Sequence, residues 1–231
     1  MTQLLISVSS IDEAAIALDK GVNIIDLKHP AKGALGALEP ETIQVITKLV
    51  RSRDASKLIT ATIGDLPMQP DLLQRAVATL ATLDVDVIKI GFFDADPQPD
   101  KIYAVCIEAL RQLIGQGVKL VAVMFAEITY PAELIQMLKN AGFYGVMMDT
   151  AYKNGASLLD KLTYQQIQEF VIACKANHLQ AGLAGSLKLE HIPVLKQLMP
   201  DYIGLRGGVC DADERINSLS AFKVEVAREL L

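Results

Sequence analysis

Three lysines stand out because each lies within or just after an apolar segment. Lys28 ends the apolar segment NIIDLK, Lys89 interrupts VIKIG, and Lys153 follows MMDTAYK, whereas most other lysines fall in amphipathic, helix-like stretches. A buried, unpaired ammonium is costly, so such a lysine needs a carboxylate, an anionic ligand or a lowered pKa. An amine whose pKa is lowered can attack a carbonyl and form a Schiff base. The three lysines therefore predict imine chemistry.

Two aspartates accompany these lysines. Because side chains alternate along a strand, an inward-facing Lys28 brings Asp26 inward as well. Asp149 ends another apolar segment, four residues before Lys153. Carboxylates beside an imine can move the protons that its formation and rearrangement require. The predicted catalytic residues are therefore Asp26, Lys28, Lys89, Asp149 and Lys153.

Each of these residues also has a purely structural interpretation. Lys28 alone is typical of a strand-end side chain that reaches solvent. Lys89 alone could form an ion pair inside the fold, and Lys153 lies in a polar loop. Asp149 could cap the following helix. Their combination at equivalent strand ends is what favours a functional site.

Short apolar runs alternate with longer amphipathic stretches along the whole chain. The apolar runs predict eight strands, near Leu4–Val8, Asn23–Lys28, Leu58–Ile63, Val87–Phe92, Lys119–Phe125, Gly145–Asp149, Leu179–Ala184 and Tyr202–Arg206. Helices are predicted over Ile11–Lys20, Glu39–Arg51, Pro70–Leu83, Pro97–Gln116, Pro131–Asn140, Thr163–Asn177 and Leu187–Met199, and at the C-terminal end. Eight strand–helix units favour a single-domain (β/α)8 TIM barrel over residues 1–231, with an open doubly wound sheet as the alternative. In a TIM barrel the catalytic groups lie at the C-terminal ends of the strands, where these lysines and aspartates are predicted.

Composition and charge narrow the choice of partners. The net charge is −5 and the chain has no basic cluster, so neither nucleic acid nor an anionic membrane surface is an expected partner. Although 51% of the residues are hydrophobic, no run approaches the roughly 18–20 apolar residues of a membrane span, and no signal peptide pattern is present. We therefore expect a cytoplasmic protein. The three cysteines and three histidines show no ligand spacing, so we predict no metal site and no cofactor, and we leave homo-oligomer formation open.

Glycine-rich segments follow the last two predicted strands. They read AGLAGSLKLEHIP and GLRGGVC. Loops at these positions of a TIM barrel frequently bind phosphate through backbone N–H groups, and an arginine can add a bidentate contact. The alternative is that the glycines only shape tight turns. The predicted phosphate-binding residues are Gly182, Gly185, Ser186, Arg206, Gly207 and Gly208.

Two further segments are weaker candidates for the site. The PAKGALG loop, with Lys32 and Gly33, could hold a second anion or act as a lid. The TATIGDLP segment places Thr62 and Asp65 after the third predicted strand, where they could line the site. Asp65 is equally typical of a turn.

Six segments in the same order resemble the successive motifs of one enzyme family. They are IIDLKHPAKGALGA, TATIGDLP, IKIGFF, MMDTAYKNG, GLAGSLKLEHIP and GLRGGVC, within a region from about Leu4 to Asn217. They resemble the (5-formylfuran-3-yl)methyl phosphate synthase family, also called 4-(hydroxymethyl)-2-furancarboxaldehyde-phosphate synthases. The resemblance implies a TIM-barrel carbon–oxygen lyase, similar to class I aldolases, that joins two molecules of glyceraldehyde 3-phosphate. Phosphate and water are lost, and the furan product serves the biosynthesis of methanofuran or a methanofuran-like one-carbon carrier.

The resemblance also implies residue roles. It makes Lys28 the Schiff-base lysine, and the family motifs match at all five predicted catalytic positions. The chain departs from the family at Glu127, where an aspartate is common. The longer side chain keeps the charge, so the role of Glu127 stays open.

Two other functions compete with this one. The same Schiff base would serve an ordinary aldolase or isomerase that acts on a sugar phosphate. A catalytically silent barrel could instead sense a phosphorylated metabolite, but a sensor has little need for three amines at one barrel mouth.

Overall fold

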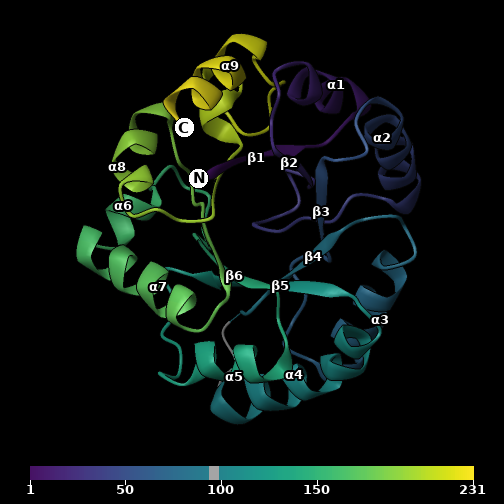
Figure 1. Cartoon of the computed structure of the whole chain (residues 1–231), viewed down its shortest axis with the longest axis vertical. Helices are drawn as coiled ribbons and strands as arrows, with labels where there is room; N and C mark the ends of the chain where they lie inside the picture. Colours follow the sequence, from purple (N-terminus) through teal and green to yellow (C-terminus); the bar gives the residue numbers. More distant parts are fainter. Residues whose placement is uncertain (94–98) are drawn as a thin grey trace.

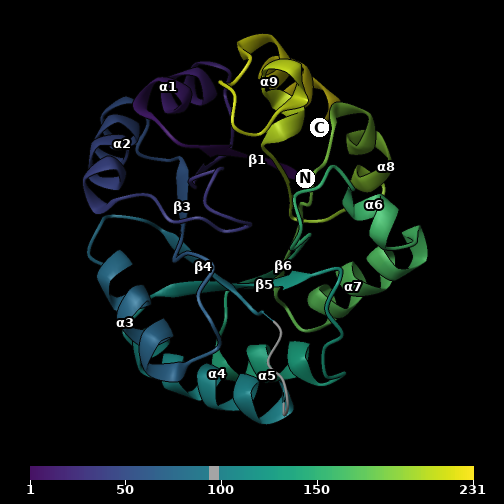
Figure 2. The same ribbon diagram turned by 180° about the vertical axis from the view of Figure 1, so that it is seen from behind.

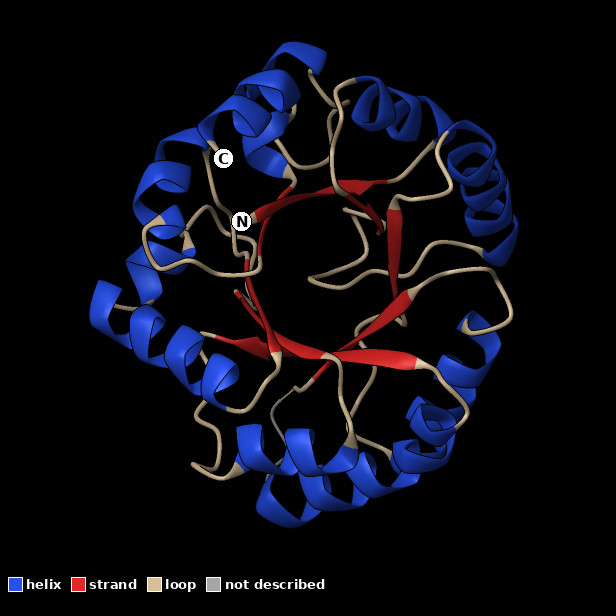
Figure 3. Cartoon of the chain, in the orientation of Figure 1, coloured by secondary structure: helices blue, strands red, loops and turns tan. Residues whose placement is uncertain are grey.

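The computed structural model of the chain describes residues 1–93 and 99–231. Its parallel strands form a closed barrel in the order β1 to β8, in which β8 pairs with β1. Figure 1 looks along the barrel, and Figure 3 shows the strands as an inner ring surrounded by helices. The predicted TIM barrel is confirmed.

The predicted strands are confirmed to within one residue at either end. Strands of a parallel barrel are covered on both faces, so they stand out in the sequence as nearly continuous apolar runs. The observed strands are β1 (Gln3–Val8), β2 (Ile24–Leu27), β3 (Leu58–Thr62), β4 (Val87–Gly91), β5 (Lys119–Phe125), β6 (Gly145–Asp149), β7 (Gln180–Leu183) and β8 (Tyr202–Leu205).

The helices follow the prediction less closely. The observed helices are α1 (Ile11–Asp19), α2 (Pro40–Arg53), α3 (Pro70–Leu80), α4 (Pro99–Gly115), α5 (Leu134–Ala141), α6 (Leu158–Lys161), α7 (Tyr164–Ala176), α8 (Ile192–Lys196) and α9 (Ala221–Leu230). The predicted start of a helix at Pro97 lies outside the described residues. Figure 2, from the opposite side, shows α9 beside α1, where the ring of helices closes.

One helix prediction was wrong in part. The segment Leu187–Met199 was expected as a single helix, but it contains a 3-10 turn, η1 (Leu189–His191), followed by the short α8. Pro193 lies in the first turn of α8, where its missing N–H costs nothing, whereas inside a longer helix it would break a hydrogen bond. The short α6 was not predicted.

The barrel interior changes character along its axis. Near the N-terminal ends of the strands it is filled by apolar side chains, among them Leu5, Ile24, Val87 and Val121. A larger apolar layer lies between the outside of the barrel and the helices. Toward the C-terminal ends the buried inward-facing residues become charged. The fold therefore concentrates its buried charges at the mouth where TIM barrels carry their sites.

Candidate active site

A cavity of about 380 Å³ lies at the C-terminal ends of the strands. Cavities of this size accommodate small-molecule ligands. Its lining contains all of the predicted catalytic residues and most of the predicted phosphate-binding residues: Asp26, Lys28, Lys89, Asp149, Lys153, Gly185, Ser186, Arg206, Gly207 and Gly208. Side chains and loops from β2, β4, β6, β7 and β8 therefore converge on one space.

Lys89 points into the barrel and is paired with Asp26. The Lys89 Nζ lies 2.7 Å from Asp26 Oδ1, and the two side chains are 2% and 0% exposed. Asp26 also accepts hydrogen bonds from the hydroxyls of Ser7 and Thr60, each at 2.7 Å. Burial alone would raise the pKa of Asp26, but the charges of Lys89 and Lys28 outweigh burial and hold this pKa below its usual value. Asp26 is thus a carboxylate fixed by three donors.

Lys153 forms the second pair, with Asp149. Its Nζ lies 2.6 Å from Asp149 Oδ1 and 3.2 Å from the hydroxyl oxygen of Thr150. The backbone N–H of Thr150 donates to the same carboxylate oxygen at 2.7 Å. Burial would raise the pKa of Asp149, but Lys153 and Lys28 lower it to about 2. Asp149 is therefore ionised throughout the pH range in which enzymes ordinarily work.

Lys28 differs from the other two lysines. Within the described residues, no carboxylate oxygen lies inside the 4.0 Å ion-pair distance of its Nζ. The residue is 7% exposed. Burial lowers the pKa of Lys28 to about 7, because the attraction of Asp149 and Asp26 only partly offsets burial and the repulsion of Lys89 and Lys153. A large fraction of Lys28 is therefore a free amine near neutral pH.

The loops after β7 and β8 present unused backbone donors to the cavity. In the part of the chain that the structure describes, the backbone N–H groups of Gly185, Ser186, Gly207 and Gly208 donate to no protein acceptor. The two loops pack closely, because a Cβ on Gly208 would lie 2.4 Å from the carbonyl oxygen of Leu187. Glycine at position 208 therefore allows the two loops, with their unused donors, to line one cavity, and unused backbone N–H groups are suited to a phosphate.

Gly182 does not lie with this group. It is inside β7 and is absent from the cavity lining, and a Cβ added to it would meet the ring of Tyr202 at 2.3 Å. Glycine here makes room for a tyrosine that helps to fill the barrel. The prediction that Gly182 binds phosphate was wrong for this reason.

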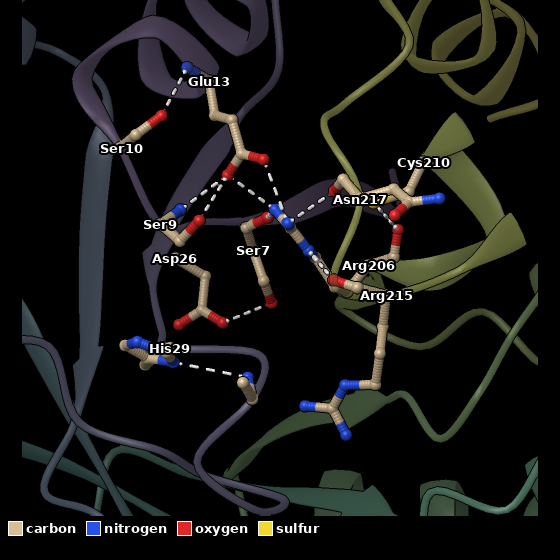
Figure 4. Close-up of polar contacts among 11 residues, drawn as sticks. Ser7, Ser9, Ser10, Glu13, Asp26, His29, Arg206, Cys210, Arg215 and Asn217 are labelled. Atoms are coloured by element: carbon tan, nitrogen blue, oxygen red, sulfur yellow. Dashed lines mark hydrogen bonds and ion pairs between the residues drawn. The ribbon is translucent and has the colours of Figure 1, made fainter. Parts of the chain in front are cut away.

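Arg206 lines the cavity, but its guanidinium is fully engaged elsewhere (Figure 4). Nη1 and Nη2 donate to the two carboxylate oxygens of Glu13, at 2.6 and 2.9 Å. The other N–H groups donate to the carbonyl oxygens of Ser7, Arg215 and Asn217. A guanidinium has five N–H donors, so none is left for a ligand. The predicted bidentate contact between Arg206 and a phosphate is therefore corrected to a structural role.

Two residues of this region were missed at the level of sequence. Glu13 follows the helix cap Ser10 and looks like an ordinary first-turn acid, yet it is the buried partner of Arg206. Arg215 lies in a polar stretch and lines the cavity. No local pattern marks either residue, because their positions depend on how the barrel closes.

The two weaker candidate segments form one connected structure. Both carboxylate oxygens of Asp65 accept backbone N–H groups of the PAKGALG loop, from Ala34 at 2.8 Å and Leu35 at 2.6 Å. Thr62 donates to the carbonyl of Gly36 in the same loop. Lys32 instead forms an exposed pair with Glu39. Asp65 thus holds the loop and is absent from the cavity lining.

Glu127 supports the loop that carries Lys153. Its Oε2 accepts the backbone N–H of Ala151 at 2.9 Å, while its Oε1 is buried and has no partner within the described residues.

No group of three or more His, Cys, Asp or Glu side chains in residues 1–93 and 99–231 is placed to hold a metal ion. In the same residues, no helix combines the length and apolar character that crossing a bilayer requires.

Comparison with known proteins assigns this barrel to a family. A family model described as 4-HFC-P synthase matches residues 4–228. The chain belongs to the 4-HFC-P synthase family. It is 40% identical over 229 residues to a protein of Methylorubrum extorquens that is named as a (5-formylfuran-3-yl)methyl phosphate synthase. The match covers 99% of the chain and 91% of the relative. It is 34% identical to the (5-formylfuran-3-yl)methyl phosphate synthase of Archaeoglobus fulgidus, over 91% of the chain and 92% of the relative. The expected family and enzyme class are confirmed.

Solved structures of other proteins superpose on the whole 4-HFC-P synthase chain and show the same TIM-barrel fold. It superposes on phosphoribosyl anthranilate isomerase from Thermus thermophilus with a TM-score of 0.67 at 15% identity, covering 99% of the chain and 98% of the isomerase. A 3-hexulose-6-phosphate synthase from Salmonella typhimurium also gives 0.67 at 15% identity, over 100% and 98% of the two chains. At this identity the likeness concerns the fold alone.

Proposed function

We propose that this enzyme condenses two molecules of glyceraldehyde 3-phosphate into (5-formylfuran-3-yl)methyl phosphate through a Schiff base on Lys28. The observation that carries the proposal is the contrast among the three lysines of the mouth. Lys89 and Lys153 are each bonded to a carboxylate, whereas Lys28 has no such partner among residues 1–93 and 99–231 and its pKa is lowered to about 7. A nucleophile must be unprotonated, so Lys28 suits the attack on an aldehyde best.

The chemistry then follows from an iminium at Lys28. The Lys28 amine adds to the aldehyde of one triose phosphate and water leaves, which makes the proton on the adjacent carbon acidic. Removal of that proton gives an enamine, and the phosphate on the next carbon can then leave with its bonding electrons. Carbon–carbon bond formation with the second triose phosphate, ring closure, dehydration and hydrolysis of the imine give the furan. The balance is two triose phosphates to one furan phosphate, one inorganic phosphate and two waters.

The neighbouring groups have distinct tasks in this scheme. We assign the exchange of protons with a substrate held on Lys28 to Asp149, which is bonded to Lys153 at the barrel mouth and lines the same cavity. Asp26 and Lys89 lie deeper in the barrel, where their ion pair keeps a second carboxylate near Lys28. The free N–H groups of the β7 and β8 loops hold the phosphate of the bound triose. This phosphate role is inferred for Gly185, Ser186, Gly207 and Gly208.

Trapping of the imine tests the proposal. We expect borohydride, added with glyceraldehyde 3-phosphate, to leave a reduced three-carbon adduct that mass spectrometry locates on Lys28. Lys28→Ala and Lys28→Arg should abolish both the adduct and turnover, since arginine keeps a charge but supplies no nucleophile. An adduct on Lys89 or Lys153 of the wild-type enzyme, or turnover by Lys28→Ala, would contradict the assignment.

Product analysis separates the synthase from an ordinary Schiff-base aldolase or isomerase. The synthase should release inorganic phosphate and form a near-ultraviolet furan chromophore from glyceraldehyde 3-phosphate alone. An aldolase or isomerase would consume the triose and release no phosphate. That outcome would retain the Schiff base and remove the furan reaction.

A further inference from the structure

Arg215 is an arginine of the cavity mouth for which the scheme above has no task. It lies between β8 and α9, lines the cavity and is partly exposed. Figure 4 shows its side chain extending away from the Arg206 cluster, so the two guanidinium groups occupy separate places. Arg206 is buried and saturated, whereas Arg215 reaches across the mouth.

The guanidinium of Arg215 is largely unused. Its Nη2 donates to the carbonyl oxygen of Gly33 at 3.0 Å, and this is its one side-chain hydrogen bond in the described residues. None of the carboxylates described lies within 4.0 Å of it. Burial holds the pKa of Arg215 below its usual value, but arginine stays protonated in proteins. Arg215 is therefore a partly desolvated cation with spare donors facing a cavity.

The backbone on which Arg215 stands is rigidly held. Arg206 Nε donates to the carbonyl of Arg215 at 2.8 Å, and Arg206 itself is locked by Glu13. The opposite anchor, the loop at Gly33, is held by Asp65 through the N–H groups of the next two residues. A Cβ on Gly33 would lie 1.8 Å from Asp65 Oδ2, so the loop can sit here only with glycine at this position. A buried ion pair between Arg206 and Glu13 therefore fixes one end of the bridge across the mouth, and two hydrogen bonds to Asp65 fix the other.

We propose that Arg215 holds the phosphate of the second triose phosphate. This assignment rests on the proposed function, in which two phosphorylated molecules must be bound at once. The N–H groups of the β7 and β8 loops provide one anion site, and the guanidinium of Arg215 provides another. Its planar fork matches two phosphate oxygens, and it can exchange the weaker bond to the Gly33 carbonyl for a charged acceptor. The ligand class is a phosphate monoester.

The test separates the first substrate from the second. Arg215→Gln should leave the glyceraldehyde 3-phosphate concentration that half-saturates borohydride trapping on Lys28 unchanged, because trapping needs one triose. The KM for furan formation should rise roughly 10- to 100-fold, the cost of losing hydrogen bonds to a charged group. Arg111→Gln, which removes an exposed arginine from α4, is the matched control and should change neither value. An unchanged KM in Arg215→Gln, or an equal rise in both values, would overturn the assignment.

A binding measurement keeps this test independent of the reaction. Titration calorimetry with inorganic phosphate should find two sites on the wild-type enzyme and one on Arg215→Gln. If the wild-type enzyme forms no furan, the proposed function fails, while loss of one phosphate site in the variant still supports the anion site. Equal phosphate stoichiometry in the two proteins would refute it. Should Arg215→Gln fold poorly, Arg215→Lys carries the same comparison, with a smaller rise in KM expected because lysine lacks the fork.

Discussion

Replacement of Lys89 by glutamine should move the reactivity of Lys28 to higher pH. In the native structure the charge of Lys89 helps to lower the pKa of Lys28 to about 7, while Asp26 raises it. The variant removes the positive charge and leaves Asp26 without its ion-pair partner at 2.7 Å. Both changes favour protonated Lys28. Glutamine can still donate a hydrogen bond toward Asp26, which limits the damage to the buried site.

The size of the effect follows from Coulomb's law. Two unit charges about 5 Å apart, in a medium with an effective dielectric constant of about 20, interact by about 3 kcal/mol. Because about 1.4 kcal/mol corresponds to one unit of pKa, loss of the Lys89 charge should raise the pKa of Lys28 from about 7 to about 9. At pH 7 the free-amine fraction would then fall from about one half to about one hundredth.

The assay is the initial rate of borohydride trapping on Lys28, measured from pH 6 to pH 10. It reports imine formation alone, so it is insensitive to any other role of Lys89 in turnover. The wild-type rate should fall as the pH drops below about 7, and the variant rate should fall below about 9 and recover at pH 10. Lys48→Gln, on the exposed side of α2, removes the same charge as a control. A Lys89→Gln profile with its midpoint still near 7, or trapping absent at every pH from a folded variant, would refute the electrostatic argument.

Three further substitutions probe other parts of the site. Asp149→Asn should lower kcat about 10²- to 10⁴-fold if the carboxylate moves protons, and steady-state kinetics with intact trapping on Lys28 would separate this loss from loss of the imine. Gly208→Ala should weaken the binding of inorganic phosphate about tenfold, because its Cβ would lie 2.4 Å from a carbonyl oxygen of the neighbouring loop and would push the two loops apart. Unchanged binding by calorimetry would argue against a phosphate site there. Glu13→Gln should cost about 3 kcal/mol in free energy of unfolding, measured with urea, since it breaks a buried bidentate pair with Arg206; an unaltered unfolding curve would contradict that role.

The fold and the gathering of charged residues at the barrel mouth could be predicted because they follow from local rules. A covered parallel strand is apolar, so the strand pattern is visible, and a charged residue inside such a strand is conspicuous. Lys89 within VIKIG is one example, and the alternation that joins Lys28 to Asp26 is another. All three residues line the cavity as expected. Which lysine lacks a carboxylate could not be predicted, because pairing depends on distances between strands.

The surroundings of the proposed phosphate site were harder to predict for a different reason. Arg206 and Glu13 are 193 positions apart and meet only because the last strand pairs with the first. The sequence shows an arginine among glycines, a pattern typical of anion binding. It does not show that the carboxylate of Glu13 takes up the donors of that arginine. Gly182 likewise serves a tyrosine of the next strand rather than a ligand. In each case a non-local partner decides what a locally suggestive residue does.

The proposed anion sites and the proposed nucleophile make opposite electrostatic demands on the barrel mouth. A phosphate dianion placed beside Lys28 would raise the pKa of its amine and oppose attack on the aldehyde. In the proposed scheme phosphate binds the neutral N–H groups of the β7 and β8 loops and the guanidinium of Arg215, while Asp26 and Asp149 are each bonded to another lysine. Each buried carboxylate is paired with another lysine, so in the part of the chain that the structure describes no carboxylate lies within ion-pair distance of Lys28. On the proposed scheme, a protein with a net charge of −5 binds two phosphate dianions while the pKa of Lys28 stays lowered to about 7.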